Sequence, residues 1–309
     1  MGKARPAELV LGSVQLGLPY GAANRTGMPS HANALTMVRR AAHAGLTLDT
    51  ARAYGDSENR IGEALSARKR TRTITKLSPL SELSADSSRR VICEAVDASV
   101  AASLDALRRD KLDCLLLHRA AHITAFGGAI WERLIEKLEE GTVLSLGVSV
   151  QSPQEALMAL AWPDVQHLQL PFNLLDWRWR AHGVIDRLAG RPHITVHARS
   201  VFLQGILAAG DETVWPRVPG VDAAYVLELL AEEAERFGRT NVADLCVAFV
   251  RGQSWIDGLV IGMETENQFD ENMRLFLRPP MAEHDCLQLE QRLPRLPERL
   301  LDPAQWPRQ

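Results

Sequence analysis

The chain lacks any hydrophobic run long enough to cross a membrane. Among its 309 residues no stretch approaches 18 uninterrupted apolar side chains, and the opening MGKARPAELVLGSV has no extended apolar core of the secretory type. Pro6 stands where an N-myristoylated protein carries Ser or Thr. These absences argue against a membrane span, a secretory signal and a lipid anchor, so we expect a cytoplasmic protein.

Cysteine is scarce and shows no pairing pattern. The four cysteines lie far apart in the chain, without a CxxC pair or a histidine-rich metal spacing: they are Cys93, Cys114, Cys246 and Cys286. Cys114, inside the apolar run LDCLLLH, is most simply a small buried hydrophobic residue. Free thiols are typical of a reducing compartment, and we expect no metal site.

The sequence also lacks an excess of basic charge. The formal net charge is −3 and the isoelectric point is near 6.3, which argues against nucleic acid as the main partner. Apolar residues make up 46% and charged residues 24% of the chain, as in ordinary globular proteins. We therefore expect a partner of small-molecule size.

Short apolar runs alternate with longer amphipathic stretches along the chain. The runs predict strands at 8–17, 46–50, 71–76, 112–118, 142–149, 165–172, 193–200 and 256–262. The stretches between them predict helices at 31–45, 57–69, 87–109, 127–140, 153–161, 178–190, 222–237, 241–252 and 266–277. Asp56 or Ser57 is the expected N-cap of the second helix, and Thr240 that of the eighth.

This alternation predicts a parallel α/β sheet, because parallel neighbours need crossovers of this length. Eight units in about 260 residues fit a (β/α)8 TIM barrel, although a doubly wound open sheet has the same alternation. No GxGxxG follows the first strand, which favours the barrel. We expect one domain over 1–309, with its core at about 9–278 and an extension at about 279–309. The long segment 200–221 is predicted to be a functional loop.

Ionisable residues end three successive predicted strands. Asp49, Lys76 and His118 end the second, third and fourth strands, and Tyr54 follows five residues after Asp49. In a barrel the carboxyl ends of the strands surround the active-site mouth. Each residue alone is more often a solvated terminus, a turn residue or a packed side chain. Together they predict a site.

The motifs in this order resemble the aldo-keto reductase superfamily. They are LDTARAYGDSENRIGEAL, the TK of the third strand, LLLHR, GVS, QLPFN, RSVFLQGIL and GMETENQFDEN, and they run from about residue 9 to 275. The resemblance implies an NAD(P)-dependent enzyme that moves a hydride reversibly between a nicotinamide and a carbonyl carbon.

The chemistry assigns a role to each of the four residues. Reduction needs a proton donor for the developing alkoxide, and Tyr54 is the candidate general acid and base. The Lys76 ammonium would stabilise the phenolate, and Asp49 would hold Lys76 charged and in place. His118 would orient or polarise the carbonyl. The family implies the same roles.

Cofactor residues are implied by the resemblance, position by position. Ser149 and Gln169 resemble the nicotinamide carboxamide binders, and Val150 replaces the Asn that often follows the former. Phe172 lies where an aromatic side chain often stacks on the nicotinamide, with ordinary barrel packing as the alternative. The resemblance further implies a pyrophosphate-wrapping loop with Ser200, Phe202, Leu203 and Gly205, and an adenosine-binding run with Gly262, Glu264, Thr265, Gln268, Glu271 and Asn272.

Glu264 departs from the family pattern. NADP-preferring members commonly carry a basic residue near this position, which meets the 2′-phosphate. A carboxylate would repel that phosphate and accept hydrogen bonds from ribose hydroxyls, as in NAD sites. This difference predicts a preference for NAD(H) over NADP(H).

Substrate specificity is open at the sequence level. Tyr20 and Trp177 are predicted to line the mouth, and Asn173 to belong to its rim. GSVQLGLPYGAANRTG resembles a bacterial subgroup that includes NAD-linked aldose dehydrogenases, so oxidation of a sugar lactol is the alternative to reduction of an aldehyde or ketone.

A regulatory NAD(H)-binding barrel and a metal-dependent hydrolase are further alternatives. An intact Tyr54 argues against a regulatory barrel, which does not need a proton donor. Lys76 argues against a metal-dependent hydrolase, because its charge would repel a metal ion among the few candidate ligands. The resemblance favours a monomer.

Overall fold

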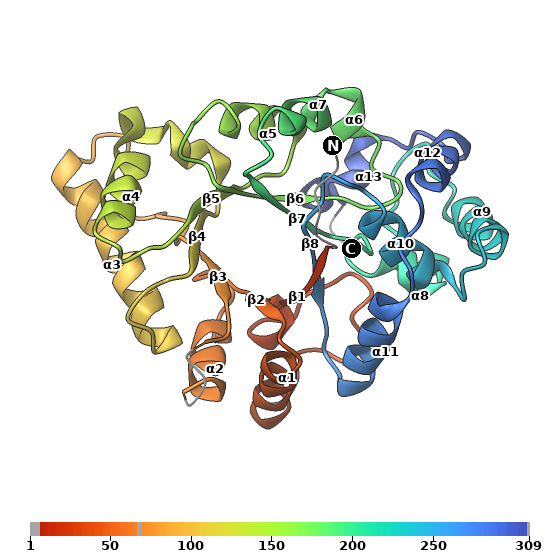
Figure 1. The fold of residues 1–309 in the computed structure, drawn as a ribbon, viewed down its shortest axis with the longest axis horizontal. Helices are drawn as coiled ribbons and strands as arrows, with labels where there is room; N and C mark the ends of the chain where they lie inside the picture. The colour runs from red at the N-terminus through yellow and green to blue at the C-terminus, as the bar shows by residue number, and fades with distance from the viewer. Residues whose placement is uncertain (1–6, 67–69, 308–309) are drawn as a thin grey trace.

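Eight parallel strands close into a barrel in the order of the sequence, β1 to β8 (Figure 1). A computed structural model describes residues 7–66 and 70–307 of the chain. The strands are β1 (Glu8–Gly12), β2 (Thr47–Asp49), β3 (Thr73–Lys76), β4 (Cys114–Leu117), β5 (Leu146–Ser149), β6 (His167–Pro171), β7 (Thr195–Arg199) and β8 (Gly258–Gly262). The predicted (β/α)8 barrel is confirmed, and the open sheet is excluded because β8 pairs with β1.

Helices surround the barrel in Figure 1. They are α1 (His31–His43), α2 (Ser57–Ala64), α3 (Arg89–Leu107), α4 (Ala129–Glu139), α5 (Pro153–Ala159), α6 (Arg178–Ala181), α7 (Val184–Ala189), α8 (Ile206–Ala209), α9 (Ala223–Arg236), α10 (Val242–Arg251), α11 (Glu266–Leu277), α12 (Glu283–Arg292) and α13 (Glu298–Leu301). Short 3₁₀ turns are η1 (Val14–Leu16), η2 (Ala120–Ile123), η3 (Ala125–Gly128), η4 (Glu212–Val214) and η5 (Pro303–Gln305). Within the described ranges, no helix combines the length and apolar character of a membrane span.

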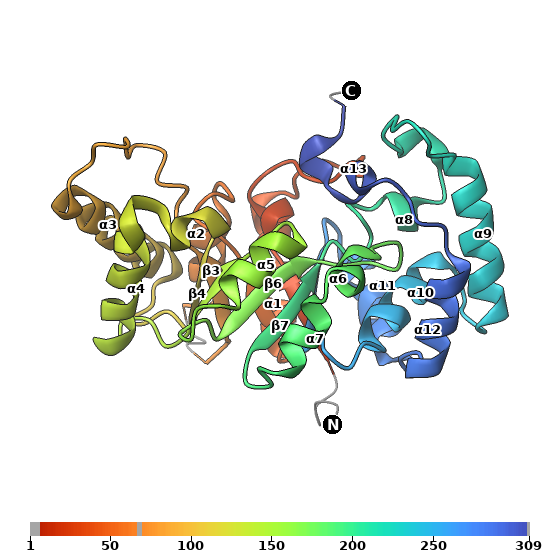
Figure 2. The same ribbon diagram turned by 90° about the horizontal axis from the view of Figure 1, so that it is seen from above.

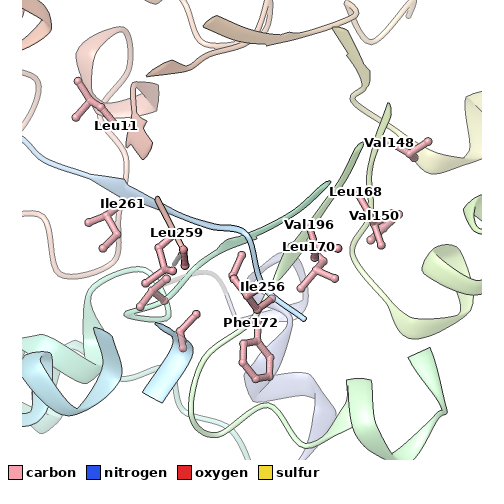
Figure 3. Close-up of a cluster of buried hydrophobic side chains, with 14 of the residues drawn as sticks. Leu11, Val148, Val150, Leu168, Leu170, Phe172, Val196, Ile256, Leu259 and Ile261 are labelled. Atoms are coloured by element: carbon pink, nitrogen blue, oxygen red, sulfur yellow. The ribbon is translucent and has the colours of Figure 1, made fainter. Parts of the chain in front are cut away.

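Alternation along each strand separates two apolar layers. Leu48, Leu115 and Leu168 belong to the main buried cluster, which includes buried residues of the surrounding helices. Figure 3 shows further members of this cluster along neighbouring strands. Ile74 and Leu116 form a separate small cluster with Cys114. Because side chains alternate between faces, this second cluster shares the barrel interior with Lys76 and His118.

Several predicted boundaries of strands and helices were wrong, and the local backbone conformation shows why. The first strand ends at Gly12, and Val14–Leu16 form a 3₁₀ turn. The predicted helix 178–190 divides into α6 and α7 because Gly183 adopts a left-handed conformation, with φ 72°. The N-cap of α10 is Asn241, whose side chain accepts from the Asp244 amide, rather than Thr240.

Two further predicted segments, the helix 57–69 and the loop 200–221, also differ from the structure. Helix α2 begins after Asp56 as predicted and ends at Ala64, while 67–69 of its predicted range lie outside the described residues. The segment 200–221 contains the short α8 and η4.

The C-terminal segment contains helices and is tied to the barrel. Figure 2 shows α13 at the upper end of the barrel. The Trp177 indole donates to the main-chain oxygen of Leu296 at 3.0 Å, and Gln151 Nε2 donates to Asp302 Oδ1 at 2.9 Å. Since the strands run toward this end, the segment lies beside the mouth of the barrel.

Gly62 permits a close approach of α2 to the end of α3. A Cβ atom at this position would lie 2.1 Å from the main-chain oxygen of Ala106. We expect Gly62→Ala to reduce the free energy of unfolding by about 1–3 kcal/mol, because two packed backbones would have to separate. Urea unfolding followed by circular dichroism measures the change.

Gly190→Ala is the matched control. Gly190 has φ −76°, and the nearest atom to an added Cβ would be 3.5 Å away. We expect its unfolding midpoint to stay close to that of the parent protein. Equal losses in both variants would contradict the role of Gly62 in helix packing.

Candidate active site

Polar side chains gather where the strands end. Asp49, Lys76, Ser149 and Arg199 are the last residues of β2, β3, β5 and β7, and His118 directly follows β4. Parallel strands of one barrel end on the same side, so residues far apart in the sequence become neighbours. A cavity of about 980 Å³ opens at this end, and its walls include Asp49, His118, Ser149 and Arg199.

Lys76 and Asp49 form a buried ion pair at the floor of this site. Lys76 Nζ lies 2.7 Å from Asp49 Oδ1 and 2.8 Å from Oδ2, and it donates a further hydrogen bond of 2.9 Å to the main-chain oxygen of Thr50. Lys76 is 1% exposed and Asp49 is 3% exposed. Gln169 Nε2 donates to Asp49 Oδ1 at 2.7 Å, which orients the carboxylate from the opposite wall.

The ion pair keeps Lys76 protonated. Burial alone would lower the pKa of Lys76, but the Asp49 carboxylate acts against it and the phenol of Tyr54 adds to this effect, so the pKa is raised. The site therefore contains a fixed ammonium group in a region without bulk water.

A tight turn holds Tyr54 above the lysine. The Tyr54 amide donates to the Ala51 main-chain oxygen at 3.0 Å, and the Ser57 amide donates to the Tyr54 main-chain oxygen at 3.1 Å. Gly17 packs against this turn, since a Cβ there would lie 1.9 Å from the Tyr54 oxygen. Lys76 Nζ is 4.9 Å from the centroid of the Tyr54 ring.

His118 packs against Tyr54 at the cavity wall. The two rings meet edge to face, with centroids 5.8 Å apart and an interplanar angle of 89°. Burial, reinforced by the charges of Lys76 and Arg199, lowers the pKa of His118 to about 4. The imidazole is therefore neutral at neutral pH. Its buried Nδ1 has no hydrogen-bond partner within 7–66 and 70–307.

The cavity extends from these residues to the segments for which the sequence predicts cofactor contacts. Its walls contain most of the predicted residues: Ser149, Ser200, Phe202, Gly205, Gly262, Glu264, Gln268, Glu271 and Asn272. The end of the Gln15 side chain packs against Gly262, where an added Cβ would lie 2.2 Å from Gln15 Oε1. Tyr20 also lines the cavity, as predicted for a substrate contact, and is 40% exposed.

Gln169, Leu203 and Thr265 are placed behind the cavity wall. Leu203 is buried in the hydrophobic core. Thr265 forms a capping box with Gln268 at the start of α11, and Gln268 Oε1 accepts from the Glu264 amide at 2.7 Å. Gln169 is fully buried, and its Oε1 has no hydrogen-bond partner among the described residues.

Two predicted aromatic contacts do not fit the structure. Phe172 is buried and packs edge to face on Trp255, with ring centroids 4.9 Å apart, so it belongs to the core shown in Figure 3. Trp177 stacks on His182 and bonds the C-terminal segment, so it does not line the cavity. Asn173 is likewise buried, and its Oδ1 accepts from the Leu175 amide in a turn.

Several polar residues of the cavity wall were not predicted from the sequence, among them Arg199, Gln15 and Gln151. Arg199 ends β7 in the manner in which Lys76 ends β3, so the position at a strand end was the available signal. Gln15 and Gln151 lie in connections, where no periodic pattern marks them. No group of three or more His, Cys, Asp or Glu side chains suited to a metal ion occurs in the described part of the chain.

Comparison with known proteins agrees with this geometry. The family model described as "Aldo/keto reductase family" matches residues 8–291. No curated protein matches the sequence. Among solved structures, the holo form of the aldo-keto reductase AKR11C1 from Bacillus halodurans has a TM-score of 0.72 at 19% identity, covering 96% of this chain and 98% of that one.

A second solved structure is a putative aldo-keto reductase from Pseudomonas aeruginosa. Its TM-score is 0.63 at 19% identity, and the match covers 88% of this chain and 90% of that one. At this identity the two solved structures support the fold alone. The family itself is assigned by the match of residues 8–291 to the family model. The chain belongs to the aldo/keto reductase family.

Proposed function

We propose that the chain is an NAD(P)-dependent oxidoreductase that interconverts an aldehyde or ketone and the corresponding alcohol. The observation that carries this proposal is the placement of Tyr54 between the buried Lys76 ammonium and the neutral His118, at the floor of one cavity. These groups supply what carbonyl reduction requires at the oxygen atom: a proton donor, a stabilising positive charge and a neutral hydrogen-bond donor.

The proton moves at the hydroxyl of Tyr54. When the carbonyl is reduced, this hydroxyl donates its proton to the developing alkoxide, and the Lys76 ammonium stabilises the phenolate that results. Asp49 holds Lys76 charged, and Gln169 holds Asp49. In oxidation the phenolate takes the proton from the alcohol. His118 orients the substrate oxygen by a hydrogen bond.

A bound nicotinamide dinucleotide would supply or accept the hydride. The residues present fit such a group: the Ser149 side chain lies on the cavity wall, and its hydroxyl suits the carboxamide. The loop from Ser200 to Gly205 and the start of α11 would hold the pyrophosphate and the adenosine. Glu264 on the cavity wall favours ribose hydroxyls over a 2′-phosphate.

Tyr54→Phe tests the catalytic assignment. We expect kcat to fall about 10²- to 10⁴-fold, because the proton donor is lost while the ring remains. The dissociation constant for NADH, measured by fluorescence titration, should stay unchanged. A panel of aldehydes, ketones and free sugars, assayed in both directions, identifies the substrate used.

Tyr225→Phe is the control, since Tyr225 is exposed and does not line the cavity. Full activity in both variants would refute the role of Tyr54. A parent protein that binds NADH but turns over no member of the panel would instead favour a regulatory barrel.

The pKa of His118 predicts a pH dependence. Because that pKa is lowered to about 4, the imidazole is neutral from about pH 5 upward and becomes charged only below this range. We expect kcat/KM to show no titration of His118 between about pH 5 and 8. The NMR signal of His118, assigned by its loss in His118→Gln, should titrate near pH 4. A midpoint near 6.5 would contradict the effect of burial and of the neighbouring cations.

Glu264 predicts cofactor preference. We expect kcat/KM to be higher with NADH than with NADPH, and Glu264→Gln to shift the ratio toward NADPH about tenfold, or ~1.4 kcal/mol, as a repulsive charge is removed. Glu266→Gln is the control, because Glu266 bonds Arg40 outside the cavity. Equal shifts in both variants, or a parent preference for NADPH, would refute the assignment.

A further inference from the structure

Arg199 places a fixed positive charge in the cavity wall. Its Nη2 donates to the main-chain oxygen of Val150 at 3.1 Å and to Gln151 Oε1 at 2.6 Å. In the described part of the chain these are the guanidinium's only hydrogen bonds, and no carboxylate there lies within 4 Å of it. The positive charge of Arg199 and the remaining N–H groups of its guanidinium can therefore interact with a molecule bound in the cavity.

Two carboxylates at this end of the cavity already have partners. Asp49 is neutralised by Lys76, and Glu155 Oε2 accepts from the Gln151 amide at 2.6 Å. His118 is neutral, and Arg199 is among the groups that keep it so by lowering its pKa. Because no carboxylate of the described residues pairs with the guanidinium directly, the field of Arg199 reaches the reactive end of the cavity.

Arg199 is also fixed beside the strand end that we assign to the nicotinamide. Val150, which accepts its hydrogen bond, directly follows Ser149. Gln151 cannot easily turn its amide away from Arg199, because its Nε2 donates to Asp302 of the C-terminal segment. Both ends of the Gln151 amide are therefore occupied, and the guanidinium is held in place.

We propose that Arg199 makes this site select the redox state of the cofactor, favouring the reduced nicotinamide over the oxidised one. The reduced ring is neutral and the oxidised ring carries a positive charge, so a fixed cation nearby destabilises only the oxidised form. This inference rests on the proposed function. It adds a specificity-determining residue that acts through charge rather than through shape.

The test is the ratio of the dissociation constants for NAD⁺ and NADH, measured by calorimetry on the full chain. We expect Arg199→Met to lower the ratio Kd(NAD⁺)/Kd(NADH) about tenfold, since one unit charge several ångströms away is removed. Arg199→Lys should keep a ratio close to that of the parent, because it retains the charge. Arg119→Met should change it less than Arg199→Met, because Arg119 lines the cavity but is exposed to solvent, which screens its charge.

Three outcomes would overturn the proposal in different ways. If Arg199→Met changes both dissociation constants by the same factor, Arg199 has only a structural role. If the ratio is unchanged while KM rises for aldehydes that carry a carboxylate, Arg199 binds an anionic substrate instead. If the parent protein binds neither NAD⁺ nor NADH, the proposed function fails, and this inference fails with it.

Discussion

The ion pair between Lys76 and Asp49 is the interaction on which the site depends. A lysine this deeply buried would lose its proton without a partner, and a carboxylate left alone there would be equally unfavourable. The structure satisfies both groups: Lys76 has three oxygen acceptors, and Asp49 accepts an additional hydrogen bond from Gln169. The pair adds little net charge to the site, yet it fixes an ammonium group under Tyr54.

The barrel supplies the surroundings that make this pair effective. Ile74 lies below Lys76 on β3, and Leu116 lies below His118 at the end of β4, so apolar side chains line the interior under the polar ring. Water is kept away from the floor, and charges act more strongly in such a region than in solvent. Burial lowers the pKa of His118, whereas the Asp49 carboxylate outweighs the effect of burial on Lys76 and raises its pKa.

The fold and the floor of the site were predictable from the sequence, because both depend on local pattern. Strand period and strand ends identify Asp49, Lys76 and His118 without knowledge of distant contacts. Phe172 and Trp177 were not predictable in this way: their positions depend on Trp255 and on Leu296, which lie far along the chain. Arg199 also lies at the end of a strand, but nothing else in the sequence around it indicates a cavity residue.

Residues from both halves of the chain line the cavity at the mouth of the barrel. Gln151 bonds Arg199 with its oxygen and Asp302 with its nitrogen, so the C-terminal segment takes part in orienting a charged group of the cavity. Asp49 and Lys76 stand on short strands whose register the whole barrel constrains, and Tyr54 and His118 stand on the connections that follow β2 and β4. The groups around them stand on connections and on a terminal segment, which tolerate change more readily. The buried ion pair thus depends on the barrel strands, whereas the orientation of Arg199, at the end of β7, depends also on the C-terminal segment.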